Sequence, residues 1–506
     1  MSELSRTAVV WFRNDLRIHD HEPLISALQS RPANLVCVYV LDPRHFGTTR
    51  LFHFSKTGSI RAKFLFESLA DLRKKLQSMG NDLLILRGFT ENVVPELIEK
   101  MQPCELYYHQ EATDEETQVE ASLVKALTDQ GVKAHSYWGS TLYHKSDLPF
   151  VVKNLPPVFT QFRIACENKA KIRGPLASPT TVPPAPSGVD FGRLPELKEF
   201  DLPEPSSDPR SVLQFEGGET AAMERLNHYF WETDRLKSYK LTRNGLLGAD
   251  YSSKFAPWLA IGCISPRQIA AEVALYEQDR VQNDSTYWLV FELIWRDYFR
   301  FFALQAGTSL FHLSGPRKIK KKWNQDNTLL NAWIEGRTGI PFIDANMREL
   351  LLTGFQSNRG RQNVASFLVK SLGVDWRAGA EWFESQLIDF DVCSNWGNWS
   401  YVAGVGNDPR QDRYFQVIKQ ARDYDPKGIY VKTWLPELES LSAEMVHEPW
   451  RMEQGGQGNL SFGFQYGRDY PRPIVDLEAS YTKLRAEQAS NPNDQSRPFH
   501  QRKSRR

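Results

Sequence analysis

Short apolar runs alternate with amphipathic helical stretches in the first third of the chain, and this rhythm restricts the fold more than any other feature. The runs are AVVWF, LVCVYVLD, DLLILRG and ELYYHQ, separated by segments such as IRAKFLFESLADLRKKLQSMG. Buried parallel strands connected by covering helices have this pattern. It predicts a doubly wound α/β domain over residues 1–135. Because no G-x-G-x-x-G follows the first run, it does not indicate a dinucleotide bound in the Rossmann manner.

The character of the sequence changes twice beyond this domain. Nine prolines lie between Gly174 and Arg210, which predicts an extended connector over residues 136–215. Long helical periodicity then predicts a mostly α domain over residues 216–480. Residues 481–506 are polar and without periodicity, which predicts a disordered tail. We therefore expect a Rossmann-like parallel-sheet domain, a long connector and a helical domain, as suits 506 residues.

Charge, cysteine usage and hydropathy exclude several classes of protein. A net charge of +1 argues against a generally basic nucleic-acid binder, although a local basic patch is compatible with it. The five cysteines are scattered and never form C-x-x-C, so neither a disulfide framework nor a metal site is predicted. The apolar runs are too short to cross a bilayer, and a strand-like run begins at residue 7. We expect a soluble, cytoplasmic protein without a signal or transit peptide.

Polar residues recur at helical spacing inside apolar stretches of the second domain. In IDFDVCSNWGNWSY, Asp391, Asn395 and Trp399 stand at i, i+4 and i+8, with Asp389 just before them. The same spacing recurs in SNRGRQNVASFLVK and LVFELIWRDYFRFF, at the residues Asn358, Arg361 and Gln362, and Glu292, Trp295 and Arg296. Since buried polar atoms need partners, the pattern predicts a site filled by a polar, aromatic group. The alternatives are a plain Arg361–Asp389 ion pair and indoles that only fill a core.

The segment ADYSSKFAPWLAIGCISPR resembles a phosphate-binding helix start. Ser252, Ser253 and Lys254 precede a helical run with Pro257 in its first turn, and Tyr239 lies upstream. Together these groups would suit a pyrophosphate. Taken alone, the segment favours simple capping of the helix by the two serines.

Seven motifs in order resemble the photolyase and cryptochrome family, most closely its DASH cryptochrome branch, over residues 7–475. They are WFRNDLRIHD, SSKFAPWLA, ELIWRDYFR, SNRGRQNVASF, DFDVCSNWGNW, GVGNDPRQDRYF and WLPEL. The resemblance implies an FAD held in the helical domain and an antenna chromophore near the α/β domain. Gln356 and Trp396 depart from residues common in DASH relatives, but neither touches the expected chemistry.

The resemblance also implies roles for individual residues. Asn395 would face flavin N5, Arg361 paired with Asp389 would lie beside the ring, and Asp391 would accept from flavin or ribityl donors. The other implied flavin-binding residues are Tyr239, Ser252, Ser253, Lys254, Phe255, Ala256 and Arg296. Glu111 matches the glutamate that binds a folate antenna, 5,10-methenyltetrahydrofolate; without the resemblance it would be a surface glutamate. Trp399, Trp376 and Trp323 match a tryptophan relay for electrons, so they must converge in space.

Substrate preference follows from the same resemblance. Glu292, Trp295 and Asn358 match the positions that contact a pyrimidine dimer in repair enzymes. Gln362 and Tyr401 stand where duplex-repairing relatives carry methionine and tryptophan, and the resulting loss of stacking area predicts a preference for single-stranded DNA. The basic run RKIKKKW, residues 317–323, is expected to contact phosphates together with Arg359, Arg410 and Arg413. A solvated loop is the alternative for that run.

We therefore expect a blue-light-absorbing, monomeric flavoprotein that splits cyclobutane pyrimidine dimers in single-stranded DNA, with Trp399, Trp376, Trp323, Asn395 and Glu292 as its catalytic residues. A photoreceptor or DNA-binding transcriptional regulator without repair activity is the alternative. A light-independent flavin oxidoreductase ranks last, because no nicotinamide site is visible in the sequence.

Overall fold

The computed structural model describes residues 6–407, 414–454, 460–461 and 464–489. The chain divides into two compact units. The first comprises Met1–Leu310, Glu349–Ser357 and Ala380–Gly397, and the second comprises Phe311–Arg348, Asn358–Gly379 and Asn398–Arg506. The first unit thus continues past residue 215, and the domain boundary expected there stays a prediction.

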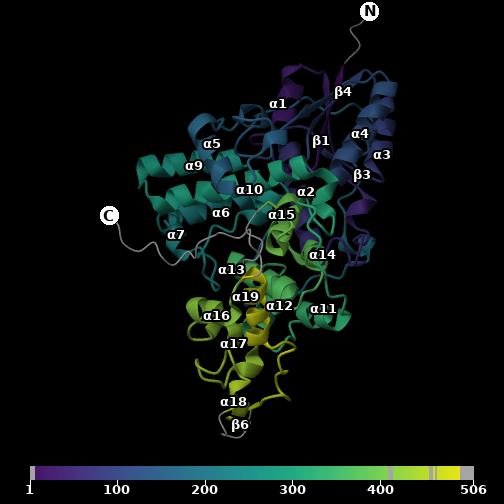
Figure 1. Ribbon diagram of the computed structural model, residues 1–506. Coiled ribbons are helices and arrows are strands. Elements are labelled where there is room, and N and C mark those ends of the chain that lie inside the picture. The colour runs from purple at the N-terminus through teal and green to yellow at the C-terminus, as the bar shows by residue number, and fades with distance from the viewer. Residues whose placement is uncertain (1–5, 408–413, 455–459, 462–463, 490–506) are drawn as a thin grey trace, which may run out of the picture. The chain divides into compact units, whose positions relative to one another are not determined.

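Parallel strands form the sheet of the first unit, and among the described residues there are five in the order β3-β2-β1-β4-β5 (Figure 1). They are β1 (Thr7–Phe12), β2 (Asn34–Leu41), β3 (Leu83–Arg87), β4 (Cys104–His109) and β5 (Ala134–Tyr137). All residues of β1 and nearly all of β2 are buried, which explains their unbroken apolar sequence. The strand order reverses between β1 and β4, so the prediction of a doubly wound α/β fold is confirmed.

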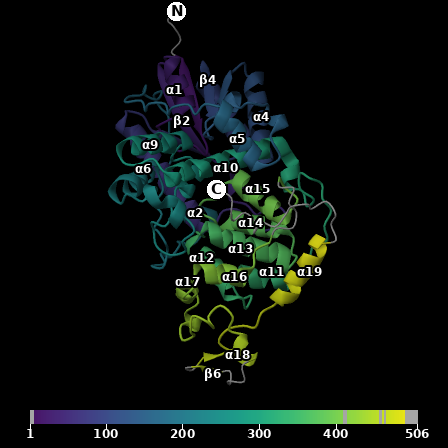
Figure 2. The same ribbon diagram turned by 60° about the vertical axis from the view of Figure 1, so that its left-hand side comes forward.

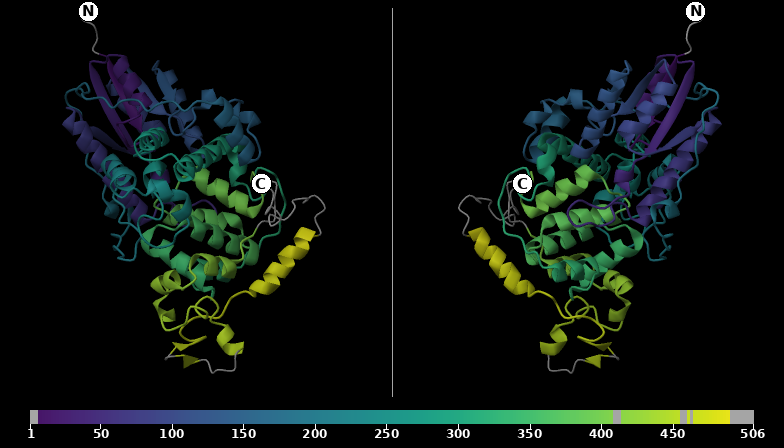
Figure 3. Two further views of the ribbon diagram at one scale, coloured as in Figure 1. Left: turned by 90° about the vertical axis from the view of Figure 1, so that its left-hand side faces the viewer. Right: turned by 90° about the vertical axis from the view of Figure 1, so that its right-hand side faces the viewer.

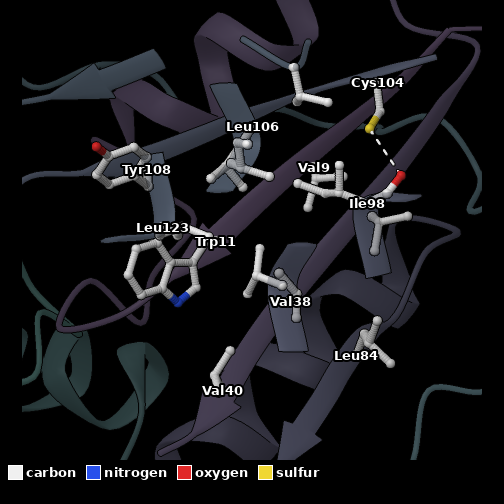
Figure 4. Close-up of a cluster of buried hydrophobic side chains, with 14 of the residues drawn as sticks. Val9, Trp11, Val38, Val40, Leu84, Ile98, Cys104, Leu106, Tyr108 and Leu123 are labelled. Atoms are coloured by element: carbon white, nitrogen blue, oxygen red, sulfur yellow. Dashed lines mark hydrogen bonds between the residues drawn. The ribbon is translucent and has the colours of Figure 1, made fainter. Parts of the chain in front are cut away.

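Four helices connect these strands, namely α1 (Glu22–Gln29), α2 (Ser59–Ser78), α3 (Thr90–Lys100) and α4 (Asp114–Asp129). Figure 2 shows α1 and α4 beside the strands. On the face covered by α3 and α4, Ile98 and Leu123 pack against Val9, Val38 and other strand residues in one apolar core (Figure 4). Within this core, the thiol of Cys104 donates to the carbonyl of Ile98 at 3.7 Å (Figure 4).

The proline-rich stretch packs on the first unit, and the extended connector predicted over residues 136–215 is wrong for residues 159–169, which form a helix. Between α5 (Phe159–Lys169) and a 3₁₀ turn at Leu197–Phe200, the described residues 170–196 include no helix or strand. The backbone N–H of Leu35 donates to Pro184 at 3.0 Å, and that of Ile85 donates to Phe191 at 3.1 Å. Phe191 also contacts the apolar core. The connector therefore borders the sheet.

The remainder of the described chain is mainly helical. Its helices are α6 (Glu219–Asn227), α7 (Tyr239–Thr242), α8 (Ala256–Ala260), α9 (Pro266–Asp279), α10 (Asp284–Ala306), α11 (Asn327–Ile334), α12 (Pro341–Thr353), α13 (Asn358–Ser366), α14 (Trp376–Gln386), α15 (Val392–Ala403), α16 (Val417–Tyr424), α17 (Ile429–Trp434), α18 (Arg451–Gln454) and α19 (Leu477–Ala489). A small antiparallel pair joins β6 (Leu460–Ser461) to β7 (Phe464–Gln465). None of the described helices has both the length and the apolar character needed to cross a membrane.

The long helix α10 begins and ends at clear signals. Asn283 caps its first turn by accepting from the backbone of Ser285 at 2.7 Å and Thr286 at 3.2 Å. Thr286 returns a side-chain bond to the backbone N–H of Asn283, which completes a capping box. The helix ends at Gly307, whose φ of +52° is readily adopted only by glycine.

The prediction of a disordered tail over residues 481–506 is wrong for residues 481–489, which belong to α19, yellow in Figure 3. The ring of Tyr481 stacks on that of Tyr414 with centroids 5.3 Å apart. Its hydroxyl accepts from the backbone N–H of Val417 at 2.9 Å. These long-range contacts of one tyrosine hold a segment whose own periodicity is weak. Residues 490–506 lie outside the described residues.

Candidate functional site

Asp391 and Asn395 lie at the start of α15 in the first unit. The predicted stripe required Asp391 to lie within the helix, but this residue precedes it. Its Oδ1 accepts from the backbone N–H of Ser394 at 2.7 Å. It is therefore the N-cap, a role for which aspartate is favoured. The side chain of Asn395 is buried, and its Nδ2 donates to the carbonyl of Ala380 at 2.9 Å. This bond fixes an amide that can donate and accept but does not ionise.

One guanidinium bridges two buried carboxylates. Arg300 on α10 donates through Nη1 to Glu111 Oε2 at 2.9 Å, and through Nη2 to Asp391 Oδ2 at 3.0 Å. The side chains of Arg300, Glu111 and Asp391 are 3%, 9% and 8% exposed. Nη2 of Arg296 lies 4.0 Å from the same oxygen of Asp391. These four residues therefore form one ion-pair cluster within the first unit. Arg300 was missed in the sequence, because its carboxylate partners are 189 and 91 positions away.

The electrostatics of this cluster favour its charged form. Burial opposes the charge of Arg300, but Glu111 and Asp391 outweigh it and raise the pKa of the guanidinium. Burial likewise opposes the charge of Asp391, but Arg300 and Arg296 outweigh it and lower the pKa of that carboxyl. Arg300 is thus cationic and Asp391 anionic at neutral pH.

Glu111 follows β4 and is buried, so its alternative interpretation as a surface glutamate is wrong. Its Oε1 accepts from Nδ2 of Asn14, which follows β1, at 2.9 Å. The carboxyl ends of β1 and β4, where the strand order reverses, are where open α/β sheets bind ligands. The position of Glu111 at this edge of the sheet favours the predicted folate contact, which stays a prediction.

Glu292 and Trp295 lie on α10 within a group of aromatic and basic side chains. Arg243 forms an ion pair with Glu292, and Nε1 of Trp288 donates to Glu292 at 3.1 Å. Burial raises the pKa of Glu292, although Arg243 opposes this effect. The ring of Trp295 stacks on that of Phe159 with centroids 3.5 Å apart and planes at 8°. Arg243 and Phe159 were missed in the sequence, because only the fold brings them to this helix, whereas Trp288 stands on α10 four residues before Glu292 and could have been found from helical spacing.

The segment before α8 has the predicted helix start, with Pro257 in the first turn, but the capping interpretation is wrong. Phe255 occupies the N-cap position, and no side chain caps the helix. Ser252 and Ser253 instead present their carbonyls to Arg225, whose Nη2 and Nε donate to them at 3.2 and 3.0 Å. The two serines therefore do not cap this helix through their side chains.

Lys254 adopts an uncommon backbone conformation next to these serines. Its φ is +61°, a left-handed value that is rare for a residue with a side chain. The side chain is buried, and Nζ lies 2.9 Å from the ring centroid of Tyr251 and 3.3 Å from Oγ of Ser252. An ammonium beside hydroxyls is the chemistry that binds phosphate. Tyr239, at the start of α7, is also buried, and burial raises the pKa of its phenol.

In the second unit, α13 carries Asn358, Arg361 and Gln362. Asn358 is exposed, and Nη1 of Arg359 donates to Oε1 of Gln362 at 2.9 Å. The guanidinium of Arg359 also lies 4.5 Å from the ring centroid of Tyr424. Arg359 therefore contacts Gln362 and Tyr424 within the second unit. Its predicted contact with a DNA phosphate stays a prediction.

Two further predicted arginines, Arg410 and Arg413, lie outside the described residues. Tyr401 is half-buried in α15 and belongs to the second unit. The expected Arg361–Asp389 pair would join residues of the two units, so it stays a prediction, as does the convergence of the groups assigned to the flavin and the substrate.

The three tryptophans predicted to form a relay belong to the second unit. Trp376 and Trp399 are buried, whereas Trp323 is half-buried. The backbone of Asn324, next to Trp323, forms an isolated parallel bridge with Val374, two residues before Trp376. This pairing brings those two chain segments together. The convergence of all three indoles stays a prediction.

Comparison with known proteins agrees with this architecture. The family model for DNA photolyase matches residues 8–186, and that for the FAD binding domain of DNA photolyase matches residues 288–490. A cryptochrome DASH from Gloeobacter violaceus is 54% identical over 473 residues, 94% of each chain. One from Xenopus laevis is 51% identical, covering 93% of this chain and 90% of the relative.

Solved structures give the same result. A Synechocystis cryptochrome is 51% identical with a TM-score of 0.91, covering 96% of this chain and 100% of the other. A class III photolyase from Agrobacterium tumefaciens is 27% identical with a TM-score of 0.81, covering 97% and 98%. With these identities over nearly its whole length and an FAD-binding domain in its second half, the chain belongs to the photolyase and cryptochrome family, in the cryptochrome DASH branch.

Proposed function

We propose that this cryptochrome DASH acts, as a monomer, on cyclobutane pyrimidine dimers in single-stranded DNA and splits them by light-driven electron transfer. The observation that carries the proposal is the group on α10, where Glu292 is held by Arg243 and Trp288 beside Trp295. A carboxyl group with a raised pKa, an orienting cation and an indole together suit an extruded pair of bases.

The FAD-binding residues fit the cofactor chemically. Lys254, Ser252 and Ser253 would hold the pyrophosphate, with Tyr239, Phe255 and Ala256 around them. This fit rests on the ammonium of Lys254 lying beside the hydroxyl of Ser252 before α8, with Arg225 holding the backbone. The bound flavin supplies the electron that light makes available.

The ring-facing residues would be Asn395, Asp391, Arg296, Arg361 and Asp389. Asn395 would present a fixed amide to flavin N5 and, having no ionisable proton, would leave charge on that edge in place. Asp391 would accept from flavin donors, and its Arg300 contact keeps it ionised for that purpose. Arg361, paired with Asp389, would favour negative charge on the ring.

The substrate side of the proposal rests on four residues besides Glu292. Trp295 would stack on a base, a contact worth about 1–3 kcal/mol, and its own orientation is set by stacking on Phe159. Asn358 would supply an amide at the exposed start of α13. Gln362 and Tyr401 reduce the stacking area, so we expect too little binding energy to unpair a duplex but enough for a single strand.

The antenna proposed for Glu111 is 5,10-methenyltetrahydrofolate. Each oxygen of this carboxylate accepts one bond, from Asn14 and from Arg300. Since a carboxylate oxygen has two lone pairs, each oxygen of Glu111 can accept a second hydrogen bond, from the paired donors of a pterin amidine. Trp323, Trp376 and Trp399 would form a relay that passes an electron from the surface toward the flavin.

A photoreceptor or transcriptional regulator without repair is the second candidate, because a relay that includes the buried Trp376 and Trp399 would serve photoreduction whether or not DNA is bound. The deciding experiment illuminates the purified, FAD-loaded protein with dimer-containing oligonucleotides, single-stranded and duplex in parallel. Restoration only in single strands supports the proposal. No restoration in either, with normal flavin photoreduction, favours the photoreceptor, and a protein that takes up no FAD contradicts both.

A further inference from the structure

Arg300 connects two carboxylates to which the proposed function gives different ligands. Glu111, after β4, is the proposed folate contact, and Asp391, before α15, is the proposed flavin contact. Their oxygens lie 2.9 and 3.0 Å from the two terminal nitrogens of the same guanidinium. All three residues lie in the first unit, so this contact is internal to it.

The surroundings make the bridge sensitive to charge. The three side chains are less than one-tenth exposed, so their interactions are stronger than they would be in water. Nε of Arg300 is buried and has no hydrogen-bond partner among the described residues. A buried donor without a partner is unusual, and it means that this guanidinium is not held by its full set of bonds.

The rest of the cluster is arranged so that Arg300 is the connecting element. Glu111 is held on its other side by Asn14 at 2.9 Å, and its backbone N–H donates to Glu120 at 2.8 Å. Asp391 is held by the backbone N–H of Ser394 at 2.7 Å. Both carboxylates are thus anchored to separate elements, and the guanidinium is the charged group that they share.

We propose that Arg300 is a positioning residue that couples folate binding at Glu111 to the charge of the flavin at Asp391. The proposal rests on the proposed function for these two sites. Negative charge added on the flavin side draws the guanidinium toward Asp391 and weakens its bond to Glu111. The carboxylate of Glu111 then has more capacity for the amidine donors of the pterin, so folate binds more tightly.

Linkage makes this effect reciprocal. If reduction of the flavin tightens folate binding, folate binding favours reduction by the same factor. We expect a factor of about ten, within the usual range for coupled sites. For a two-electron couple, a tenfold ratio equals a shift of about 30 mV in midpoint potential.

A purely structural Arg300 would behave differently. It would hold the loop after β4 against the start of α15 without responding to either ligand. Its replacement would then lower stability, while folate would bind equally to the oxidised and the reduced protein. The ratio of the two affinities therefore separates coupling from structural support.

The experiment measures the Kd of 5,10-methenyltetrahydrofolate for the FAD-loaded protein, oxidised and anaerobically reduced, together with the flavin midpoint potential with and without the folate. In the unchanged protein we expect a ratio of about ten and the matching potential shift. In Arg300→Lys, one ammonium replaces the two-pronged contact, and the ratio should fall to about one. Should Arg300→Lys fail to fold, the unchanged protein still tests the coupling, because equal affinities in its two redox states would overturn it.

Arg267→Lys is the matched control. Arg267 makes a two-pronged contact with Asp20 at 2.6 and 3.0 Å, both side chains are buried, and neither belongs to a proposed ligand site. This variant should keep the tenfold ratio. Equal affinities in both redox states, or no folate binding by FAD-loaded protein, would overturn the coupling and leave FAD-dependent repair standing. Failure to take up FAD would instead count against the proposed function itself.

Discussion

The indole rings of Trp333 and Trp399 meet edge to face in the second unit, with centroids 6.2 Å apart and planes at 79°. Both are buried, and Nε1 of Trp333 donates to the carbonyl of Val364 at 3.0 Å. A side chain at Gly379 would overlap the far edge of the Trp399 ring. The orientation of Trp399 is thus set from two sides.

Trp399→Phe should largely abolish flavin photoreduction, because a phenyl ring is far harder to oxidise than an indole. The smaller ring also leaves space beside Trp333, so stability should fall by about 1–3 kcal/mol. The measurement is bleaching of the flavin absorption band under blue light with an external reductant. Trp434→Phe, which removes another buried indole of the same unit, should cost similar stability and keep photoreduction. Unchanged bleaching in Trp399→Phe would argue against the relay.

Gly379→Ala should displace Trp399. The added Cβ would overlap the indole and come 2.8 Å from Cδ2 of Leu368, so we expect a loss of about 1–3 kcal/mol in the free energy of unfolding. Photoreduction should slow as well, because the ring is pushed from its position. Denaturant unfolding measures the loss in the free energy of unfolding. Gly174→Ala, where a Cβ meets nothing within 4 Å, should change stability by less than about 0.5 kcal/mol; equal losses in both variants would contradict the packing argument.

Glu292→Gln should weaken binding of a dimer-containing single strand by about tenfold, since a hydrogen bond to an ionisable group contributes about 1.5 kcal/mol. It also frees Arg243 from its partner. Fluorescence titration with labelled oligonucleotides measures the effect, and flavin photoreduction should be unchanged. Asp284→Asn, an exposed carboxylate in the first turn of the same helix, should leave binding intact. Equal Kd values for Glu292→Gln and the unchanged protein would exclude Glu292 from the substrate site.

Asp344 should make stability depend on pH. It is fully buried and accepts from the backbone of Thr338 and Gly339 and from the hydroxyl of Tyr470, yet burial raises its pKa to about 6. Its unfolded pKa is near 3.8, so the folded state holds the proton more tightly. Stability from this group is therefore complete below about pH 4 and is lost as the pH rises through about 6, by about 3 kcal/mol.

The test compares the unchanged protein with Asp344→Asn by denaturant unfolding at pH 4 and pH 7. The substitution should cost about 2.4 kcal/mol more at pH 4 than at pH 7, because asparagine cannot titrate. A difference that does not vary with pH would mean that Asp344 titrates at its ordinary value.

The basic run should set the salt dependence of DNA binding. Lys318, Lys320 and Lys322 are exposed, whereas Nζ of Lys321 donates to the carbonyl of Ala403 at 2.8 Å and is left unchanged. Replacing the three exposed lysines by glutamine should make the slope of log K against log salt shallower by about 0.7 for each phosphate that is no longer neutralised. The same change at Lys63, Lys74 and Lys125, exposed on helices of the α/β region, is the control. Identical slopes in the two triple variants would show that the run is only a solvated loop.

The sheet and the main helices could be predicted from the sequence because each depends on a local period. The apolar run around Val36 is unbroken because β2 is buried on both faces, and the spacing of Glu292 and Trp295 is that of α10. The SSKFAPW segment showed where a helix starts. Only the backbone conformation of Lys254 and the bonds from Arg225 to the serine carbonyls could show that the serines do not cap it.

The charged partners could not be predicted in this way. Arg300 and Glu111 are separated by 189 positions and Arg243 and Glu292 by 49, so no local pattern relates them. Helix α19 was missed for the same reason, because Tyr481 is held by Tyr414 and Val417. Such pairings follow from the path of the chain and not from its periodicity.

The composition of the proline-rich stretch suggests a flexible linker, yet the carbonyls of Pro184 and Phe191 accept hydrogen bonds from β2 and β3, and Phe191 packs against the core. A protease should find this stretch resistant despite its loop-like composition. A fragment without this stretch would lose the hydrogen-bond acceptors of the Leu35 and Ile85 amides and would expose apolar surface to solvent. An isolated fragment that carries the parallel sheet should therefore include these prolines.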